Sequence, residues 1–313
     1  MKHHRAIRAA LAASLLLVAA CALSRTTTTS GVGHARQAQD DEVLRVDADL
    51  VVLNATVTDK DGGYVHKIPR SDFKVFEDGR EQTINVFSVE ETPFAAAILL
   101  DTSLSMEGRL SLGRAAAIRF LEGLRAEDVA AVYHFDSEVE QLQDFAPGRD
   151  LPPMAFGLQP NGNTVLNDAI VRAARDLSTR AEKRHSIIVL SDGADTRSSA
   201  SADKALNAAL AANATIYTVD MMAIEADAKD KMTAAAALKN FAVKSGGRYV
   251  PTPGGKALDT ALSNIVEELS NQYTLGYRPL NRARDGRWRS IELKLARNEL
   301  KARTRSGYRA PKS

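Results

Sequence analysis

The chain has 313 residues, of which 44% are hydrophobic and 26% are charged. Its 41 basic and 39 acidic residues nearly balance, so the overall charge gives no reason to expect a nucleic-acid partner. It contains a single cysteine, which excludes an intramolecular disulfide as a source of stability.

Residues 1–22 are predicted to be a secretory signal, because a basic start precedes the short apolar core Ala9 to Ala20. That core is too short to cross a bilayer as a helix. Cys21 closes it in Val18-Ala19-Ala20-Cys21, which resembles the bacterial lipobox and implies an acylated cysteine and a membrane anchor. Ordinary cleavage at Ala20-Cys21-Ala22 is the alternative. Either way we expect an exported protein of the cell envelope, membrane-anchored, periplasmic or secreted.

Residues 23–42 are polar and of low complexity, which predicts a flexible tether. Removal of the first twenty residues would take away Lys2, Arg5 and Arg8, which leaves 38 basic residues against 39 acidic. The mature protein would therefore carry about one negative charge. This agrees with the absence of any case for nucleic acid.

Residues 43–92 are predicted to form the first part of a β-sandwich. Alternating apolar and polar residues mark half-buried strands, and Asp/Gly clusters mark the turns between them. The predicted strands are Leu44–Thr58, Asp72–Glu77 and Glu81–Val89. Asp59 and Asp61 lack the other ligands of a calcium loop, so we expect a hairpin turn there.

Residues 93–270 alternate between strand-like and helix-like segments, which predicts an α/β domain with a mostly parallel sheet. The predicted strands are Phe94–Leu100, Val129–Asp136, Glu138–Asp144, Ser186–Leu190, Thr215–Asp220 and Arg248–Pro251. The predicted helices are Leu112–Leu124, Leu166–Ser178, Ala202–Ala212, Lys231–Ser245 and Lys256–Asn271. The second and third strands are almost contiguous, so we expect an antiparallel hairpin at one edge of the sheet.

Residues 271–311 return to strands, predicted at Gln272–Tyr277, Trp288–Ala296 and Leu300–Thr304. Two separate small β modules would each have a marginal core. We therefore predict one β-sandwich built from residues 43–92 and 271–311, with the α/β domain inserted between its two parts.

The clearest functional motif is Asp101-Thr102-Ser103-Leu104-Ser105, which directly follows the first buried strand of the α/β domain. Open α/β sheets bind ligands at the carboxyl ends of their strands. Asp101, Ser103 and Ser105 offer hard oxygen donors, which suit Mg²⁺. Thr164, at the start of a helix, and Asp192, after another buried strand, add oxygen donors on two further loops.

This arrangement resembles the metal-ion-dependent adhesion site of von Willebrand factor type A domains, which have a Rossmann-like fold. That family uses D-x-S-x-S, then a Thr, then an Asp, on three loops above a parallel sheet. The resemblance assigns metal binding to Asp101, Ser103, Ser105, Thr164 and Asp192, with Mg²⁺ or Mn²⁺ as the cofactor. It also implies a protein partner whose Asp or Glu completes the metal's coordination. Without Thr164 and Asp192, the two serines would equally suit a turn that caps the next helix.

The family often has Gly where this chain has Leu104, so a positive φ at that position would strain the loop. Alternatively, Leu104 and Met106 form an apolar rim beside the metal that contacts a partner.

Three patterns suggest other chemistry. Gly108 to Gly113 has the glycine spacing of a phosphate loop, but Arg114 and Ala115 replace the Lys and the hydroxyl that hold phosphate and Mg²⁺. Ser201-Ala202-Asp203-Lys204 has the S-x-x-K spacing of serine acyl-enzymes but lacks K-T-G, so we interpret it as a helix cap. Phosphotransferases that use an Asp nucleophile commonly need a second acid two residues later, where this chain has Ser103.

The sequence therefore predicts a non-enzymatic, exported protein that binds a protein partner through a divalent metal. A Mg²⁺-dependent envelope hydrolase or phosphatase and an assembly scaffold with a structural or vestigial metal site are the two alternatives. Residues 278–312 carry twelve basic and three acidic residues. They form either the solvated face of the strands or a contact with an acidic polymer or anionic lipid.

Overall fold

The computed structural model describes residues 50–312 except 90–91, 149, 194, 223–226 and 253–254. The predicted signal at 1–22 with Cys21 and the predicted tether at 23–42 lie outside the described residues. Among the helices that are described, none has the length and apolar character needed to cross a membrane.

A six-stranded sheet forms the centre of the α/β region, in the order β10-β9-β8-β5-β6-β7. Its strands are β5 (Phe94–Asp101), β6 (Val129–Phe135), β7 (Val139–Ala146), β8 (Arg184–Ser191), β9 (Ala214–Asp220) and β10 (Tyr249–Pro251). All neighbours run parallel except β6 and β7, which form the antiparallel edge hairpin expected from the sequence. The central strand β5 is buried along its whole length, which explains its continuous run of apolar residues.

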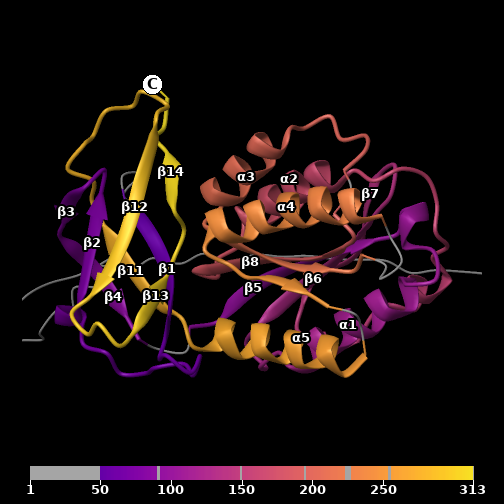
Figure 1. The fold of residues 1–313 in the computed structure, drawn as a ribbon, viewed down its shortest axis with the longest axis horizontal. Helices are drawn as coiled ribbons and strands as arrows, with labels where there is room; N and C mark the ends of the chain where they lie inside the picture. Colours follow the sequence, from indigo (N-terminus) through magenta and orange to yellow (C-terminus); the bar gives the residue numbers. More distant parts are fainter. Residues whose placement is uncertain are drawn as a thin grey trace, which may run out of the picture. The chain divides into compact units, whose positions relative to one another are not determined.

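Helices cover both faces of this sheet (Figure 1). They are α1 (Leu110–Glu122), α2 (Leu166–Leu177), α3 (Ala202–Ala211), α4 (Ala228–Ser245) and α5 (Gly255–Ser270). The buried residues of α1 and α5 pack in one core with one face of the sheet, and those of α2, α3 and α4 pack against the other face. Small alanine side chains at the contacts allow the helices to approach the strands closely. This is a doubly wound α/β architecture, as predicted.

Two four-stranded sheets make up the β-rich region, in the orders β13-β1-β11-β4 and β14-β12-β2-β3. Before the α/β region come β1 (Val51–Thr58), β2 (Phe73–Glu77), β3 (Arg80–Gln82) and β4 (Ile84–Ser88); after it come β11 (Tyr273–Tyr277), β12 (Trp288–Leu295), β13 (Lys301–Arg303) and β14 (Gly307–Arg309). Each sheet therefore combines strands from both parts of the chain. Their inner faces share one hydrophobic core, so the predicted fold class, an α/β domain inserted into a β-sandwich, is confirmed.

The β-rich region differs from the prediction in two details. The segment Glu81–Val89, predicted as one strand, is two: β3 pairs with β2 in one sheet, and β4 pairs with β11 in the other. Alternation continues across Thr83, so the pattern gives no sign that the chain changes sheets there. The three-residue strand β14 was not predicted, because it is too short to show a period.

Three short 3₁₀ turns complete the described elements: η1 (Arg70–Asp72), η2 (Leu104–Met106) and η3 (Pro153–Gly157). The second of them lies in the D-x-S-x-S loop, directly after the carboxyl end of β5. The aspartate turn after β1 is a hairpin turn, as expected, in which the Asp59 carboxylate accepts hydrogen bonds from the main chain of Asp61 and Gly63.

Candidate metal centre

The candidate metal centre lies where two neighbouring strands of the sheet, β5 and β8, end side by side. Asp101 is the last residue of β5, and Asp192 directly follows Ser191, the last residue of β8. Because β5 and β8 are parallel and adjacent, their carboxyl ends meet at one edge of the sheet. Both carboxylates are buried, with exposed fractions of 1% for Asp101 and 2% for Asp192.

Asp101 accepts hydrogen bonds at both carboxylate oxygens. Its Oδ1 accepts from the main-chain N–H of Ser103 at 2.9 Å and from the Ser103 hydroxyl at 2.5 Å. Its Oδ2 accepts from the Ser191 hydroxyl at 2.5 Å. The Ser103 and Ser105 hydroxyl oxygens are 3.0 Å apart. Three of the five predicted ligands thus form one hydrogen-bonded cluster on a single loop.

Asp192 has one carboxylate oxygen that no described group satisfies. Its Oδ1 is buried and has no hydrogen-bond partner. Its Oδ2 lies 3.9 Å from an Arg109 guanidinium nitrogen, too far for a hydrogen bond. That guanidinium also donates to the carbonyl oxygens of Ser105 and Met221, which holds it beside the site. A buried carboxylate oxygen without a donor is costly, so this atom is suited to a cation.

Thr164 lies on a loop that hydrogen bonds join to both carboxylate loops. Its carbonyl oxygen accepts from the main-chain N–H of Thr196 at 2.9 Å, in the loop after β8. On the other side, the N–H of Asn161 donates to the carbonyl oxygen of Thr102 at 2.9 Å. Thr164 itself is buried. The three loops that the sequence singled out are therefore in direct contact with one another.

The electrostatics of the site follow from this burial. Burial raises the pKa of Asp101 to about 6, the hydrogen bonds from Ser103 and Ser191 lower it in part, and the nearby charge of Asp192 raises it again. Two carboxylates that repel each other in a buried site favour a positive charge between them. A divalent cation would supply more of it than the single guanidinium of Arg109.

Gly193 lets the Asp192 loop turn immediately after the carboxylate. Its φ is +82°, a region that favours glycine, and a Cβ there would lie 2.8 Å from the Leu238 side chain and 3.0 Å from the Ala234 carbonyl oxygen. The N–H of Gly193 donates to the Ser191 hydroxyl at 2.9 Å. The close approach of α4 thus requires glycine at this position.

The donors present fit a hard cation. The serine and threonine hydroxyls and the two aspartates are oxygen ligands of the kind that Mg²⁺ binds. Among them, Asp192 Oδ1 has no described hydrogen-bond partner and is therefore available as a metal ligand. No cluster of three or more His, Cys, Asp or Glu side chains suited to a metal occurs in the described part of the chain. A soft-metal site of the zinc type therefore has no support among those residues.

The two residues of the predicted apolar rim, Leu104 and Met106, differ in their exposure to solvent. Leu104 is 57% exposed and begins η2 with a negative φ, so the loop does not require glycine there. Met106 is fully buried and packs in the core with residues of α1 and the sheet. Met106 is therefore a core residue and not part of an exposed rim, because the 3₁₀ turn directs it inward. Leu104 alone remains available to a partner.

Several residues of the site were not singled out from the sequence. Ser191 and Arg109 contact the two carboxylates directly, as described above. Behind the loop, the Thr102 hydroxyl lies 3.2 Å from His134 Nδ1, and His134 Nε2 lies 3.2 Å from Glu140. A serine that ends an otherwise apolar strand was a usable signal for Ser191. No local pattern indicated Arg109 or the Thr102–His134 pair.

Comparison with known families agrees with the fold. Residues 96–194 match the model of the family described as von Willebrand factor type A domain. The matched segment runs from β5 through the Asp192 loop, so it contains all five predicted metal ligands. The matched segment belongs to the α/β region that is inserted into the β-sandwich. A search of curated proteins gave no match.

Solved structures with a similar fold include the PilB minor pilin from Streptococcus sanguinis, at 13% identity and a TM-score of 0.45, covering 58% of this chain and 62% of that one. The von Willebrand factor domain of the type V pili tip protein Mfa5 from Porphyromonas gingivalis matches at 15% identity and a TM-score of 0.47, covering 56% and 95%. A von Willebrand factor type A protein from Catenulispora acidiphila matches at 13% and 0.44, covering 77% and 74%. The chain thus spans less than two thirds of the pilin, and similarities this low add nothing about function.

Proposed function

We propose that this protein is a non-enzymatic, exported binding protein that captures an acidic side chain of a partner protein through a divalent metal. The observation that carries this proposal is the buried Asp192 Oδ1, which has no hydrogen-bond partner within the described part of the chain and lies at the edge of the sheet where Asp101 and its serines cluster. The match to the type A family over the same segment supports it.

Asp101, Ser103, Ser105, Thr164 and Asp192 would hold the metal, which we propose to be Mg²⁺ or Mn²⁺. When bound, such an ion supplies an open coordination position that a carboxylate oxygen can occupy. Asp101 orients the Ser103 hydroxyl, and Ser191 fixes the second oxygen of Asp101. The exposed side chain of Leu104, beside these serines, would contact the partner.

The arrangement argues against Asp101 as a nucleophile. Both of its oxygens accept short hydrogen bonds, from Ser103 and Ser191, which lowers the reactivity of the carboxylate. Position 103 holds a serine, which cannot act as the second acid that such phosphotransferases use. We therefore place binding before the hydrolase alternative.

Metal binding is tested first, by calorimetric titration of the full chain with MgCl₂ and MnCl₂. We expect one site per chain in the unmodified protein and at least tenfold weaker binding in Asp192→Asn. Asp203→Asn removes an exposed carboxylate from the first turn of α3 and serves as the matched control. Equal affinity in all three proteins would overturn the metal site.

Partner capture is tested second, by retention of envelope proteins on the immobilised protein in Mg²⁺ and in EDTA. We expect a retained protein that elutes with chelator and is absent when Asp101→Ala replaces the unmodified chain. Metal binding without any chelator-sensitive partner would favour the scaffold with a structural metal. Turnover of phosphate or carboxylate esters that Asp101→Ala abolishes would favour the hydrolase.

A further inference from the structure

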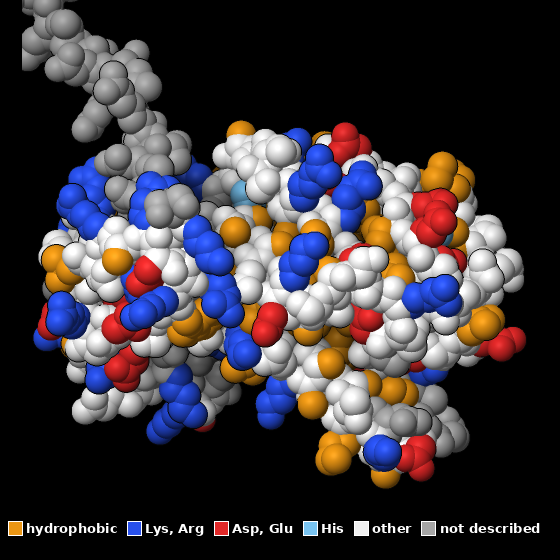
Figure 2. All heavy atoms as spheres, turned by 90° about the horizontal axis from the view of Figure 1, so that it is seen from above, with side chains coloured by type: hydrophobic (Ala, Val, Ile, Leu, Met, Phe, Trp, Pro, Cys, Tyr) orange, Lys and Arg blue, Asp and Glu red, His pale blue; other side chains and the backbone are white. Residues whose placement is uncertain are grey.

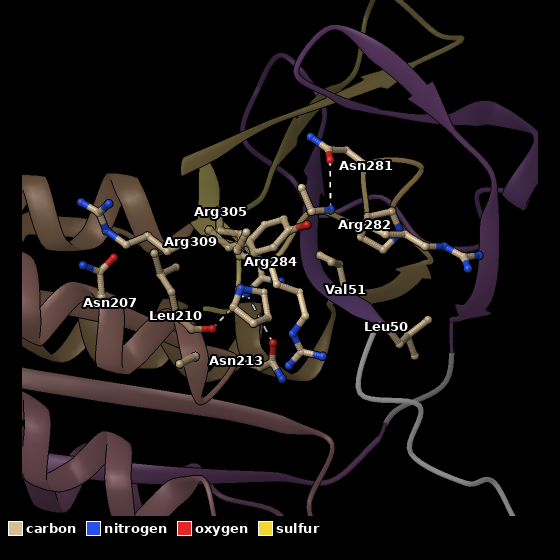
Figure 3. Close-up of a pocket in the computed structure, with 16 residues that line it drawn as sticks. Leu50, Val51, Asn207, Leu210, Asn213, Asn281, Arg282, Arg284, Arg305 and Arg309 are labelled. Atoms are coloured by element: carbon tan, nitrogen blue, oxygen red, sulfur yellow. Dashed lines mark hydrogen bonds between the residues drawn. The ribbon is translucent and has the colours of Figure 1, made fainter. Parts of the chain in front are cut away.

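A cavity of about 520 Å³ lies between α3 and the loops and strands at the end of the chain (Figure 3). Four arginines line it: Arg282, Arg284, Arg305 and Arg309. None of the described residues that line it is acidic. Its volume is in the range of small-molecule sites, and its remaining lining is largely apolar, with Leu210, Pro279 and Tyr308 among the contributors.

Arg305 is the unusual member of this group, because it is buried without a counter-ion among the residues that the structure describes. Its exposed fraction is 8%. One guanidinium nitrogen, Nη1, donates to the Leu210 carbonyl oxygen at 3.1 Å and contacts the Asn213 side-chain oxygen at 3.4 Å. Its Nε is buried and has no acceptor among the described residues. Its guanidinium carbon also lies 5.6 Å from the centre of the Tyr308 ring.

A comparison with Arg303, two residues earlier, shows what Arg305 lacks. Arg303 is paired with the buried carboxylate of Glu268, and although burial alone lowers the pKa of Arg303, that charge raises it above its usual value. Burial lowers the pKa of Arg305 to about 10, and only the tyrosines Tyr277 and Tyr308 oppose the shift. Buried arginines are normally paired with an acid, so Arg305, without one among the described residues, would favour an anion beside it.

The acidic group that bonds the same two tyrosines is already engaged. Glu77 Oε2 accepts hydrogen bonds from the hydroxyls of Tyr277 at 2.7 Å and Tyr308 at 2.9 Å. Among described carboxylates, none forms an ion pair with Arg282, Arg284, Arg305 or Arg309. Figure 2 shows Lys and Arg side chains on the β-rich region with Asp and Glu among them, so the case for a negative ligand rests on the four arginines of the pocket itself.

We propose that this cavity, which we call the arginine pocket, binds an oxyanion, a phosphate or carboxylate group, attached to an apolar body. Arginine forks match both oxyanions. Figure 3 shows Arg305 at the centre of the pocket and Arg284 extending toward Asn213, whereas Arg282 extends away. The oxyanion therefore lies between Arg305 and Arg284, and the apolar body packs along Leu210 and Pro279. The anion is either a free small molecule or the headgroup of a lipid.

The test is calorimetric titration of the full chain with hexyl phosphate and hexanoate, with 1-hexanol and inorganic phosphate as matched probes. We expect one site for the amphiphilic anions, weaker binding of inorganic phosphate and none of hexanol. Arg284→Gln, at an exposed position, should weaken binding about tenfold or more, as loss of a charge-assisted contact does. Arg287→Gln removes the same charge from an exposed arginine outside the pocket and should change affinity less than twofold.

A second variant and two conditions complete the test. Arg305→Met should abolish anion binding, and if it does not fold, Arg284→Gln still decides. Binding should be equal in Mg²⁺ and in EDTA, which separates this pocket from the candidate metal centre. Flotation with phosphatidylglycerol vesicles that depends on Arg284 would assign the anion to a lipid, and its absence to a free molecule. The proposal would be overturned if no anion bound at a probe concentration of about 10 mM, which is high enough to detect weak, millimolar binding. An equal loss of affinity in Arg287→Gln and Arg284→Gln would overturn it as well.

Discussion

Among the buried acidic residues that the structure describes, Glu268 and Asp192 have surroundings that differ in kind. At the junction with the β-sandwich, the Glu268 carboxylate of α5 is fully buried and meets donors from four elements or loops: Thr56 at 3.1 Å, Tyr217 at 2.8 Å, Arg248 at 2.9 Å and, from β13, Arg303. At the carboxyl edge of the sheet, Asp192 keeps an oxygen without any described partner. Oε2 of Glu268 makes no hydrogen bond among the described residues, but the Arg248 guanidinium lies 2.9 Å from it. The ion pair described at Asp192 is longer, at 3.9 Å from Arg109, and involves its other oxygen.

This difference suggests separate roles for the two sites. The Glu268 cluster joins β1, β9, α5 and β13, and Gln272 extends it by donating to the Tyr217 hydroxyl at 3.0 Å. A buried network of hydrogen bonds and ion pairs of this kind fixes how the inserted domain meets the sandwich. At the candidate metal centre, which we call the metal edge, the Asp192 oxygen without a described partner would instead favour an added cation, as proposed above. Stability should therefore depend on Glu268 at all times, and on Asp192 only when metal is present.

The largest effect is expected from Glu268→Gln. The substitution keeps the volume but leaves Arg248 and Arg303 without their carboxylate, and breaking a buried ion pair costs about 3 kcal/mol or more. We expect the lower end of that range, because about a third of each guanidinium side chain is exposed. Urea unfolding measures it. Glu267→Gln, on the exposed side of the same helix, should stay within about 0.5 kcal/mol; an equal loss there would contradict the comparison.

The next effect is expected from Asp192→Asn and depends on metal. At a Mg²⁺ concentration 100 times its dissociation constant, the unmodified protein should gain about 2.7 kcal/mol of stability, and the variant should gain almost none. In EDTA the two should be equally stable, or the variant slightly more so, because it removes the charge that repels Asp101. Thermal unfolding under both conditions measures this. A variant that loses stability in EDTA would show that Asp192 is structural.

The candidate metal centre could largely be predicted from the sequence, whereas the Glu268 cluster could not. Asp101, Ser103 and Ser105 lie on one loop after a strand whose apolar run predicts its burial, so one short motif located them. Alternating strands and helices predicted a mostly parallel sheet, and in such a sheet the loop of Asp192 lies at the same edge as Asp101. Met106 was misplaced, since nothing in the sequence shows that η2 turns it inward.

The Glu268 cluster was not predicted, because its partners come from distant parts of the chain. Thr56 is 212 residues away from Glu268, and no spacing rule links positions so far apart. A weak signal did exist, since Glu268 falls among the buried positions Ile265 and Leu269 of an amphipathic helix. A charged residue on such a face indicates a buried partner but does not identify it.

A smaller effect is expected from Tyr217→Phe, which removes one donor from Glu268 and an acceptor from Gln272. The expected loss is about 1 kcal/mol, the usual net value of a buried hydrogen bond. In the double variant with Glu268→Gln the two losses should not add, because both act on one network. Urea unfolding of the two single variants and the double variant measures the coupling. Additive losses would mean that Glu268 is held by its arginines alone.

The smallest effect on stability is expected at Leu104. A substitution there should separate the two proposed functions of the metal edge, metal binding and capture of a protein partner. Because this side chain is 57% exposed, Leu104→Ala should change stability by less than about 0.5 kcal/mol. Its Mg²⁺ affinity should be unchanged, since no ligand atom is altered, while capture of the protein partner should weaken. Leu104→Gly, the residue common in the family, should bring no gain, because φ is already negative and glycine adds backbone entropy to the unfolded chain. If Leu104→Gly instead strengthened metal binding, the leucine would be straining the loop, and the metal edge would be less ready for an ion than its unpaired oxygen implies.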